Sequence, residues 1–282
     1  MKSVFALVVL SAAAAAQTPD ANQILRDVQA RYASMQTYSS IGEVRDVITM
    51  DAPKGGAAPQ PELLTTFTIK LARSQMYRIT WLQKSGFFDN DGALWSDGGQ
   101  RFFRMLGHTE QPADTEEGFA GATGVSGGAA ATIPSVFFDF SVNLIKALNN
   151  PVRVGEESID GDACYVIKSH DERFDRTFWI SKETKLIRQE RTDTLNMADF
   201  QMPEMTDEII KKALQMTGKE ATPEAIQAMR DMMAAAQKMQ KTMPKPQSNS
   251  SIETHHQIKI DEPMTAGDFL GPAAITPKSP QS

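Results

Sequence analysis

The order of apolar and polar side chains predicts one helix followed by a long series of strands. Near the N-terminus, apolar residues recur at the spacing that places them on one face of a helix. Thr18 is expected to cap this helix, and Pro19 suits its first position. An amphipathic helix of this kind is expected to pack against a sheet. The residues of its apolar face are Ile24, Leu25, Val28, Tyr32 and Met35.

From Tyr38 onward, the periodicity changes to the two-residue alternation of β-strands. Turn sequences such as Asp97-Gly98-Gly99-Gln100 predict hairpins, and therefore an antiparallel meander. One face of the meander is markedly apolar, as expected for a sheet covered on one side. The predicted strands are Tyr38–Met50, Thr65–Ala72, Met76–Leu82, Ala93–Ser96, Arg101–Leu106, Val152–Ser158, Ala163–Ser169, Thr177–Ser181, Lys185–Arg191 and Ser251–Ile260.

The hairpin formed by Thr177–Ser181 and Lys185–Arg191 is the most informative part of this series. In its first strand, Phe178 and Ile180 point to one face and Trp179 to the other. Both faces therefore carry apolar bulk. A strand of this kind is expected inside a sheet, with further strands on both sides.

Two segments in the middle of the chain depart from the strand pattern. Gly107–Ala131 is rich in Gly and Ala and is expected to be a long loop, either mobile or functional. Pro134–Asn149 is expected to be an amphipathic helix rich in aromatic residues. Such a helix either covers a filled sheet face or forms a lid over a hydrophobic cavity, and both alternatives remain open.

Residues 203–243 predict a helical hairpin inserted before the last strand. Thr206 and Thr222 are typical helix caps, and Gly218 is a typical helix end. Nine methionines lie between residues 197 and 243. They have three interpretations: helix packing, an adaptable surface for partners, or a soft Cu(I) site. The residues of the copper alternative are Met229, Met232 and Met233.

The first residues have the pattern of an export signal. Lys2 precedes an apolar run at residues 4–16 that is too short to span a bilayer, and Ala14-Ala15-Ala16 suits cleavage. We expect a signal peptide at 1–16, one mature domain at 17–282, and a periplasmic or secreted location. Cys164 is the only cysteine, so no internal disulfide is expected, and it should be a small buried hydrophobe.

Composition and motifs narrow the chemistry. The 282 residues allow one large or two small domains, and a net charge of −6 argues against a nucleic-acid binder. His255 and His256 are strand neighbours that point to opposite faces, so they cannot chelate one ion. Gly124-Val125-Ser126-Gly127-Gly128 has the spacing of a G-x-S-x-G motif, but it lies in the Gly- and Ala-rich stretch expected to be a loop and not at a strand-to-helix turn. No phosphate-loop sequence is present. We therefore expect no cofactor, no catalytic residues and no enzymatic activity.

Three stretches carry a resemblance to a known superfamily: Ile24–Gly42, Phe178–Glu190 (FWISKETKLIRQE) and Ile258–Phe269. Together with the order of elements, they resemble the periplasmic lipoprotein carriers, a group that includes LolA, LolB and RseB. The insertion at about 203–243 departs from that pattern, and so does the absence of a lipobox, which argues against a LolB-like receptor. No functional residue of the carriers can be matched to a position here.

The resemblance implies an α+β fold: a strongly curved antiparallel sheet, an unclosed half-barrel, with helices on its concave face. Such proteins hold apolar groups in the hollow, where an acyl chain gains about 0.8 kcal/mol per buried methylene. The alternative is that the same side chains fill a core. The residues expected to line the hollow are Phe67, Ile69, Leu71, Tyr77, Ile79, Trp81, Trp95, Phe137, Phe140 and Leu144.

These observations predict an exported soluble binding protein for a lipid, an acyl chain or a lipidated protein. It would act as a carrier or envelope sensor in outer-membrane biogenesis, with an envelope protein as a further partner. Two alternatives remain: an interaction scaffold that works through the Met-rich helical hairpin, and a periplasmic Cu(I)-binding protein.

Overall fold

The structure is a computed structural model that describes residues 19–51, 62–84, 89–105, 108–112, 114–194, 206–216, 220–240 and 246–272. Within these ranges, eleven strands form one sheet in the order β6-β5-β4-β3-β2-β1-β11-β10-β9-β8-β7. The strands are β1 (Thr37–Met50), β2 (Glu62–Ala72), β3 (Met76–Lys84), β4 (Asp89–Asp97), β5 (Arg101–Met105), β6 (His108–Glu110), β7 (Val152–Ile159), β8 (Asp162–His170), β9 (Phe174–Ser181), β10 (Ile187–Thr194) and β11 (Pro246–Ile260).

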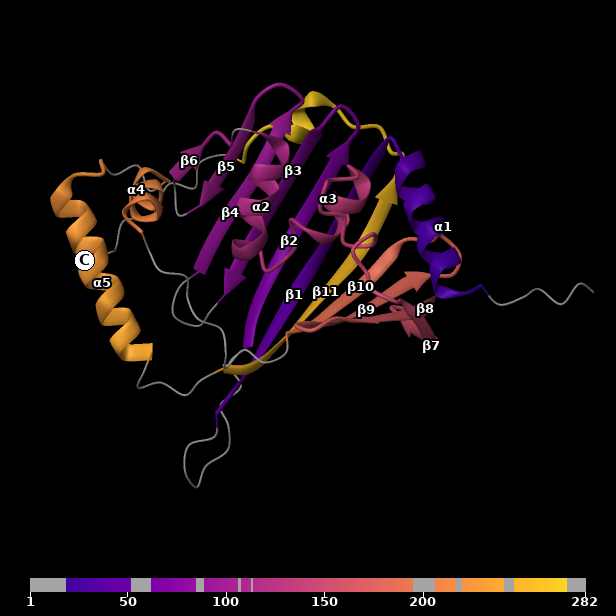
Figure 1. The fold of residues 1–282 in the computed structure, drawn as a ribbon. Helices are drawn as coiled ribbons and strands as arrows, with labels where there is room; N and C mark the ends of the chain where they lie inside the picture. The colour runs from indigo at the N-terminus through magenta and orange to yellow at the C-terminus, as the bar shows by residue number, and fades with distance from the viewer. Residues whose placement is uncertain are drawn as a thin grey trace, which may run out of the picture.

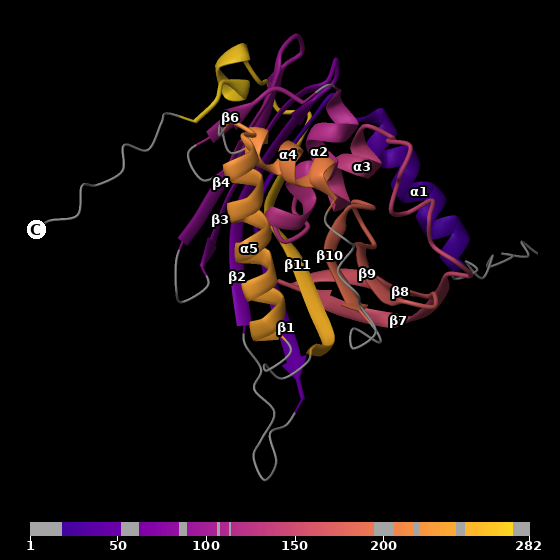
Figure 2. The same cartoon turned by 60° about the vertical axis from the view of Figure 1, so that its left-hand side comes forward.

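The sheet is antiparallel and unclosed, with β6 and β7 at its two edges. The last strand, β11, lies between β1 and β10, so it joins the meander β1–β6 to the meander β7–β10. Helices α2 and α3 lie in the concavity of the curved sheet (Figures 1 and 2). The predicted α+β half-barrel is confirmed. The helices are α1 (Ala21–Ser34), α2 (Thr115–Val125), α3 (Thr132–Phe137), α4 (Asp207–Met216) and α5 (Pro223–Gln240), with the short 3-10 helix η2 (Ala266–Phe269).

The sequence patterns of α1 and of the hairpin β9–β10 correctly predicted which side chains are buried. All five residues of the predicted helical face are buried. In β9, Phe178 and Ile180 enter the main core, whereas Trp179 packs with Cys164 and Val166 on the opposite face. Strands β8 and β11 flank the hairpin, as expected. The N-cap of α1 is Asp20, whose Oδ1 accepts from the backbone N of Gln23 at 2.8 Å.

The expectation of a long loop at Gly107–Ala131 is wrong. This stretch contains β6 and α2. Asp114 caps α2, because its Oδ1 accepts from the backbone N of Glu117 at 2.7 Å. The helix ends just before two glycines with positive φ, Gly127 (67°) and Gly128 (104°). Its Gly and Ala content hid the helix from the sequence pattern.

The expected helix at Pro134–Asn149 is also wrong, because α3 ends at Phe137. The chain then turns through Asp139, whose φ is 54°. The side-chain oxygen of Asn143 accepts from the backbone N of Ile145 at 3.1 Å and of Lys146 at 3.2 Å. Such local bonds to Asn compete with helical ones. The helical spacing of apolar residues marked burial here, not a continuous helix.

The insertion between β10 and β11 contains the two predicted helices, α4 and α5. The Thr206 hydroxyl accepts from the backbone N of Ile209 at 3.4 Å, and Thr222 does the same for Ala225 at 3.2 Å. The predicted cap Thr18, the signal peptide at 1–16 and the helix end at Gly218 lie outside the described residues. In the part of the chain that the structure describes, no helix is long and apolar enough to cross a membrane.

Candidate functional site

The concave face of β2 and β3 brings most of the predicted lining residues together. The register pairs Phe67 with Trp81, Ile69 with Ile79, and Leu71 with Tyr77. All six side chains are at most 4% exposed. Two large rings lie close over glycines of the neighbouring strands: Phe67 over Gly42 of β1, and Trp81 over Gly92 of β4. A Cβ at Gly92 would lie 2.1 Å from the Trp81 ring, so only glycine fits there.

Trp95 does not join this group. In β4, Leu94 pairs with Ile79 and faces the concavity, whereas Trp95 pairs with Arg78 and faces the convex side. There it stacks on Phe102 with ring centres 5.3 Å apart, and the chain at Gly271 passes over it. The expectation that Trp95 lines the hollow placed it on the wrong face. In β4, Gly92 occupies a concave-facing position where an apolar residue would usually reveal the alternation, so the sequence pattern did not show which face Trp95 takes.

Residues 115–149 cover the concave face, and we call them the plug. The plug comprises α2, α3 and the turns that follow. Its buried underside belongs to the same hydrophobic cluster as the sheet lining. Phe137 is 1% exposed, while Phe140 and Leu144 are half-buried. The residues of the underside are Phe119, Ala122, Ala129, Ala130, Ile133, Val136, Phe137 and Ile145.

An aromatic cluster joins the plug to β3. The ring centre of Tyr77 lies 4.7 Å from that of Phe119. Phe119 in turn lies 5.0 Å from Phe140, and Phe138 lies 5.5 Å from Phe140 and 5.0 Å from Phe137. Tilted and edge-on contacts at these distances are favourable. The cluster shows that the predicted cavity residues Phe137 and Phe140 meet the sheet lining.

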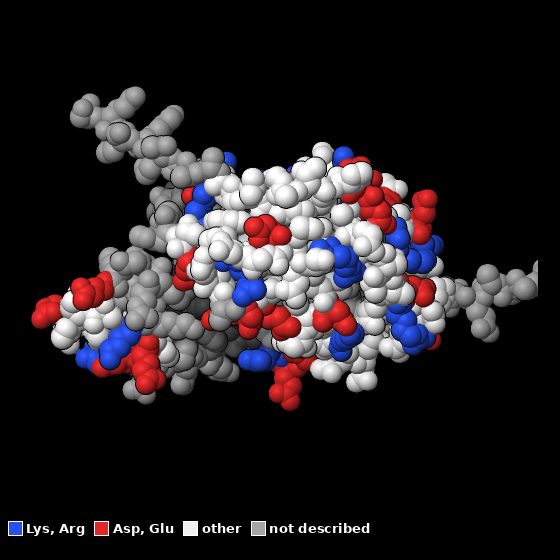
Figure 3. All heavy atoms as spheres, turned by 90° about the horizontal axis from the view of Figure 1, so that it is seen from above, with Lys and Arg blue, Asp and Glu red and all other residues white. Residues whose placement is uncertain are grey.

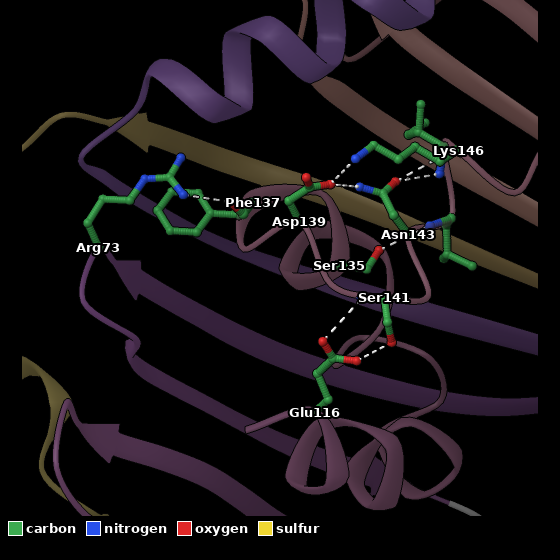
Figure 4. A network of polar contacts seen from close by, with 10 residues as sticks. Arg73, Glu116, Ser135, Phe137, Asp139, Ser141, Asn143 and Lys146 are labelled. Atoms are coloured by element: carbon green, nitrogen blue, oxygen red, sulfur yellow. Dashed lines mark hydrogen bonds and ion pairs between the residues drawn. The ribbon is translucent and has the colours of Figure 1, made fainter. Parts of the chain in front are cut away.

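Arg73, in the turn between β2 and β3, ties the plug to α1 (Figure 4). Its guanidinium donates to the carbonyl oxygens of Tyr32 (2.6 Å), Ala33 (3.0 Å) and Met35 (2.8 Å), where α1 ends. It also donates to the carbonyl oxygen of Phe137 at 2.7 Å, where α3 ends. Burial lowers the pKa of Arg73 from its ordinary value. Sequence reasoning missed Arg73, because nothing in the sequence shows that two helix ends converge on this turn.

Further polar contacts hold the turns of the plug (Figure 4). The carboxylate of Glu116 accepts from the hydroxyl of Ser141 and, at 3.1 Å, from its backbone N. Asp139 accepts from the side chain of Asn143 at 3.0 Å and from the ammonium of Lys146. The hydrogen bond from Lys146 lowers the pKa of Asp139. These contacts lie at the surface, where such pairs contribute little to stability. They therefore fix the shape of the plug but add little to the free energy needed to lift it.

A surface groove of about 540 Å³ opens beside the plug. Arg73, Gln75 and Glu116 are part of its polar wall, and Phe138 and Phe140 are its aromatic lining. The volume is that of an ordinary small-molecule pocket. Because Phe138 and Phe140 also belong to the aromatic cluster, the groove reaches the edge of that cluster from solvent.

A polar cluster lies on the concave face beneath the start of α3. Glu190 of β10 and Glu253 of β11 are cross-strand partners, 6% and 4% exposed. The hydroxyl oxygen of Thr132 lies 2.6 Å from Oε2 of each. His255 is fully buried, with Nε2 3.0 Å from Oε1 of Glu253 and Nδ1 3.3 Å from the hydroxyl of Ser40.

Burial and the neighbouring charge of Glu253 raise the pKa of Glu190. Sequence reasoning missed this cluster, although inward-facing Glu253 and His255 share a strand face. His256 faces outward and contacts Asp160 at 2.7 Å, so the two adjacent histidines do lie on opposite faces. Among the described residues, no group of three or more His, Cys, Asp or Glu is arranged to hold a metal ion.

The methionine alternatives are only partly visible. Met229 packs against Ile210 and Ile226, between α4 and α5. The side chains of Met232 and Met233 lie outside the described part of the structure, so the copper site stays a prediction. Cys164 is fully buried, as expected, and burial raises the pKa of its thiol to about 11.

No protein-family model and no curated protein sequence matches the chain. Solved structures that are similar to it include LppX, a lipoprotein of Mycobacterium tuberculosis, with 9% identity, 87% of this chain and 99% of that chain covered, and a TM-score of 0.38. LprF of Mycobacterium bovis has 10% identity, covers 86% and 94%, and has a TM-score of 0.41.

A domain of Vibrio parahaemolyticus, provisionally described as an outer membrane lipoprotein-sorting domain, has 9% identity, covers 87% and 94%, and has a TM-score of 0.32. These structures include a lipoprotein and a domain described as lipoprotein-sorting, and the similarity to them concerns the fold. At these identities and TM-scores, the matches assign no ligand and no residue's role to this chain.

Proposed function

We propose that the protein is an exported, soluble binding protein that holds an acyl chain, as a lipid or as the acylated end of a lipoprotein, on the concave face of the half-barrel. The plug covers the empty site and moves aside for the ligand. The observation that carries this proposal is how the concave face is covered. Its apolar side chains are buried against a Gly- and Ala-rich plug, not against further strands.

The energetics favour an exchange of plug for acyl chain. A chain of about fifteen methylenes gains on the order of 12 kcal/mol when it is fully buried. Lifting the plug exposes its underside, at about 1.5–3 kcal/mol for each large apolar side chain. The two terms are of similar size, because several underside residues are alanines. A near balance suits a carrier, which has to release its ligand as well as bind it.

The surroundings of the site support this role. The groove beside Phe138 and Phe140 offers a path for a chain to enter under the plug. On the face shown in Figure 3, acidic and basic side chains are interspersed, with no uniform basic surface for nucleic acid. The apolar run at residues 4–16 supports export by a signal peptide, and the resemblance supports a place in outer-membrane biogenesis without enzymatic activity or a cofactor.

Native mass spectrometry of the mature protein, combined with an organic extract of the same sample, tests this proposal. We expect either a co-purifying acyl species or uptake of added palmitate and of a synthetic triacylated lipopeptide. A protein that stays at its apo mass with both probes would contradict acyl binding. The N-terminus of the exported protein, found at Gln17 or elsewhere, tests the signal peptide separately.

A second candidate function is favoured by the helical insertion. Helices α4 and α5 form a small core of their own around Ile210 and Ile226, and Arg230 pairs with Asp207 across them. Ile209 remains 42% exposed. A self-packed hairpin with an exposed apolar residue suits a protein partner. Replacing residues 203–243 by a short linker would abolish a partner contact, but it should leave acyl binding intact.

A further inference from the structure

The contact between the plug and the two buried glutamates requires one extra proton. A hydroxyl group has a single proton to donate. Thr132, at the start of α3, lies 2.6 Å from Oε2 of both Glu190 and Glu253. If both carboxyls were ionised, one of these oxygen pairs would have no hydrogen between them. One carboxyl is therefore protonated and donates to Thr132, while Thr132 donates to the other.

The surroundings assign that proton to Glu190. Its Oε1 already accepts from the hydroxyl of Thr192 at 2.9 Å, which leaves Oε2 to carry the hydrogen. Oε1 of Glu253 lies 3.0 Å from Nε2 of the His255 imidazole. The pair is almost fully removed from water, and like charges at this distance in such a site are costly.

The other titratable groups that face the pair come from three further elements. Arg176 on β9 lowers the pKa of Glu190 through its charge, but burial and Glu253 outweigh it. Burial raises the pKa of Tyr32 on α1 and of Tyr38 on β1, and the charge of Glu253 adds to this effect. Both phenols stay neutral well above neutral pH, so neither releases a proton near neutral pH.

We propose that one proton shared by Glu190, Thr132 and Glu253 latches the plug to the sheet, so that the plug opens more readily as the pH rises. The two contacts of Thr132 connect the start of α3 to β10 through Glu190 and to β11 through Glu253. When the plug lifts, water reaches both carboxyls, and each returns to its ordinary behaviour.

The sign follows from proton linkage. The closed state binds more protons than the open state between the ordinary pKa of a glutamate, about 4.3, and the raised pKa of Glu190. Within this window, the opening equilibrium constant rises up to tenfold per pH unit, because opening releases one proton. Below and above the window, opening does not depend on this pair.

This inference rests on the proposed function for the role of plug movement, because an open plug is what a ligand needs. The movement itself can be measured without any ligand. A plug that opens with pH in a protein that binds no acyl chain would refute the proposed function and leave the latch standing. Acyl binding by a protein whose plug opening does not depend on pH would refute the latch and leave the proposed function standing.

Hydrogen exchange, followed by mass spectrometry from pH 5 to pH 8 and corrected for intrinsic exchange, tests the latch. Peptides that cover 126–138 should lose protection by up to tenfold per pH unit, whereas peptides from β2 and β3 should not. In Glu190→Gln, whose amide donates to Thr132 without a titratable proton, the slope should vanish. Flat protection in the wild type, or an unchanged slope in Glu190→Gln, would overturn the proposal.

Variants at Thr132 separate the latch from general stability. Thr132→Ser keeps the hydroxyl, so we expect the wild-type slope. Thr132→Val removes it and should lower plug protection at low pH towards its value at high pH. If Glu190→Gln fails to fold, Glu253→Gln gives the same comparison, because the shared proton is then also replaced by an amide. Equal protection in Thr132→Val and Thr132→Ser at low pH would refute the bridge.

Discussion

The guanidinium of Arg73 lies 4.2 Å from the centre of the Phe137 ring and donates to the carbonyl oxygen of the same residue at 2.7 Å. One side chain thereby stacks on the plug and also completes the hydrogen bonds at the end of α3. Its other donors complete the end of α1. A planar guanidinium with five N–H groups can do this, whereas a lysine ammonium cannot.

Arg73→Lys should therefore loosen the plug. We expect a loss of about 3 kcal/mol in the free energy of unfolding, because hydrogen bonds to charged groups contribute about 1.5–3 kcal/mol each and the ammonium cannot replace one or two of the four. Urea denaturation measures this loss. Arg78→Lys, on the convex face of β3, is the matched control and should change stability little. Equal stability of the two variants would show that Arg73 does not hold the helix ends.

Glycine substitutions test the packing of the concave lining. Gly92→Ala should cost about 1–3 kcal/mol, because the new Cβ would lie 2.1 Å from the Trp81 ring and the ring has to shift. Gly121 in α2 has open space around it, so Gly121→Ala should raise stability by about 0.5–1 kcal/mol. Thermal unfolding of both variants compares them. A neutral Gly92→Ala would contradict the close stacking.

The sheet was predictable because strand alternation survives in β2 and β3, and because β8 and β9 carry apolar residues on both faces, as strands inside a sheet do. The plug was not, since small residues conceal α2, and the chain leaves the helical path at Asp139, directly after α3, although apolar residues keep a helical spacing. Arg73, Glu190 and Glu253 were missed for a different reason. Their roles depend on residues brought together from distant parts of the chain, such as Thr132, and local patterns carry no such signal.

The C-terminal segment is anchored on the convex face through Asp268. The ammonium of Lys70 donates to its carboxylate at 2.6 Å, and Thr265 donates to it from its backbone at 2.8 Å. These contacts lower the pKa of Asp268 to about 2. Its stabilising contribution is therefore present above the ordinary carboxyl pKa and is lost as the pH falls through about 2.

An NMR titration of Asp268 checks this assignment. Lys70→Met should raise the pKa of Asp268 part of the way towards its ordinary value, because the bonds from Thr265 remain. Lys259→Met, which removes a pairing with Glu262, should leave Asp268 unchanged. An unshifted Asp268 in Lys70→Met would show that the ion pair is absent in solution.

Cys164 should be nearly inert in the folded protein. It is fully buried, and the pKa of its thiol is raised to about 11, so little thiolate is present at neutral pH. Labelling with iodoacetamide at pH 8 should be slow in the native state and fast in urea. Equal rates in the two conditions would contradict its burial between β7 and β9.

Fluorescence quenching by brominated fatty acids tests acyl binding on the concave face most directly. Trp81 and Trp95 lie on opposite faces of the same sheet, which provides a matched pair of single-tryptophan variants. With Trp95 and Trp179 replaced by Phe, a bound brominated chain should quench Trp81. With Trp81 and Trp179 replaced, Trp95 should keep its fluorescence. Quenching of Trp95 with Trp81 unaffected, or no quenching of either, would contradict an acyl-binding concave face.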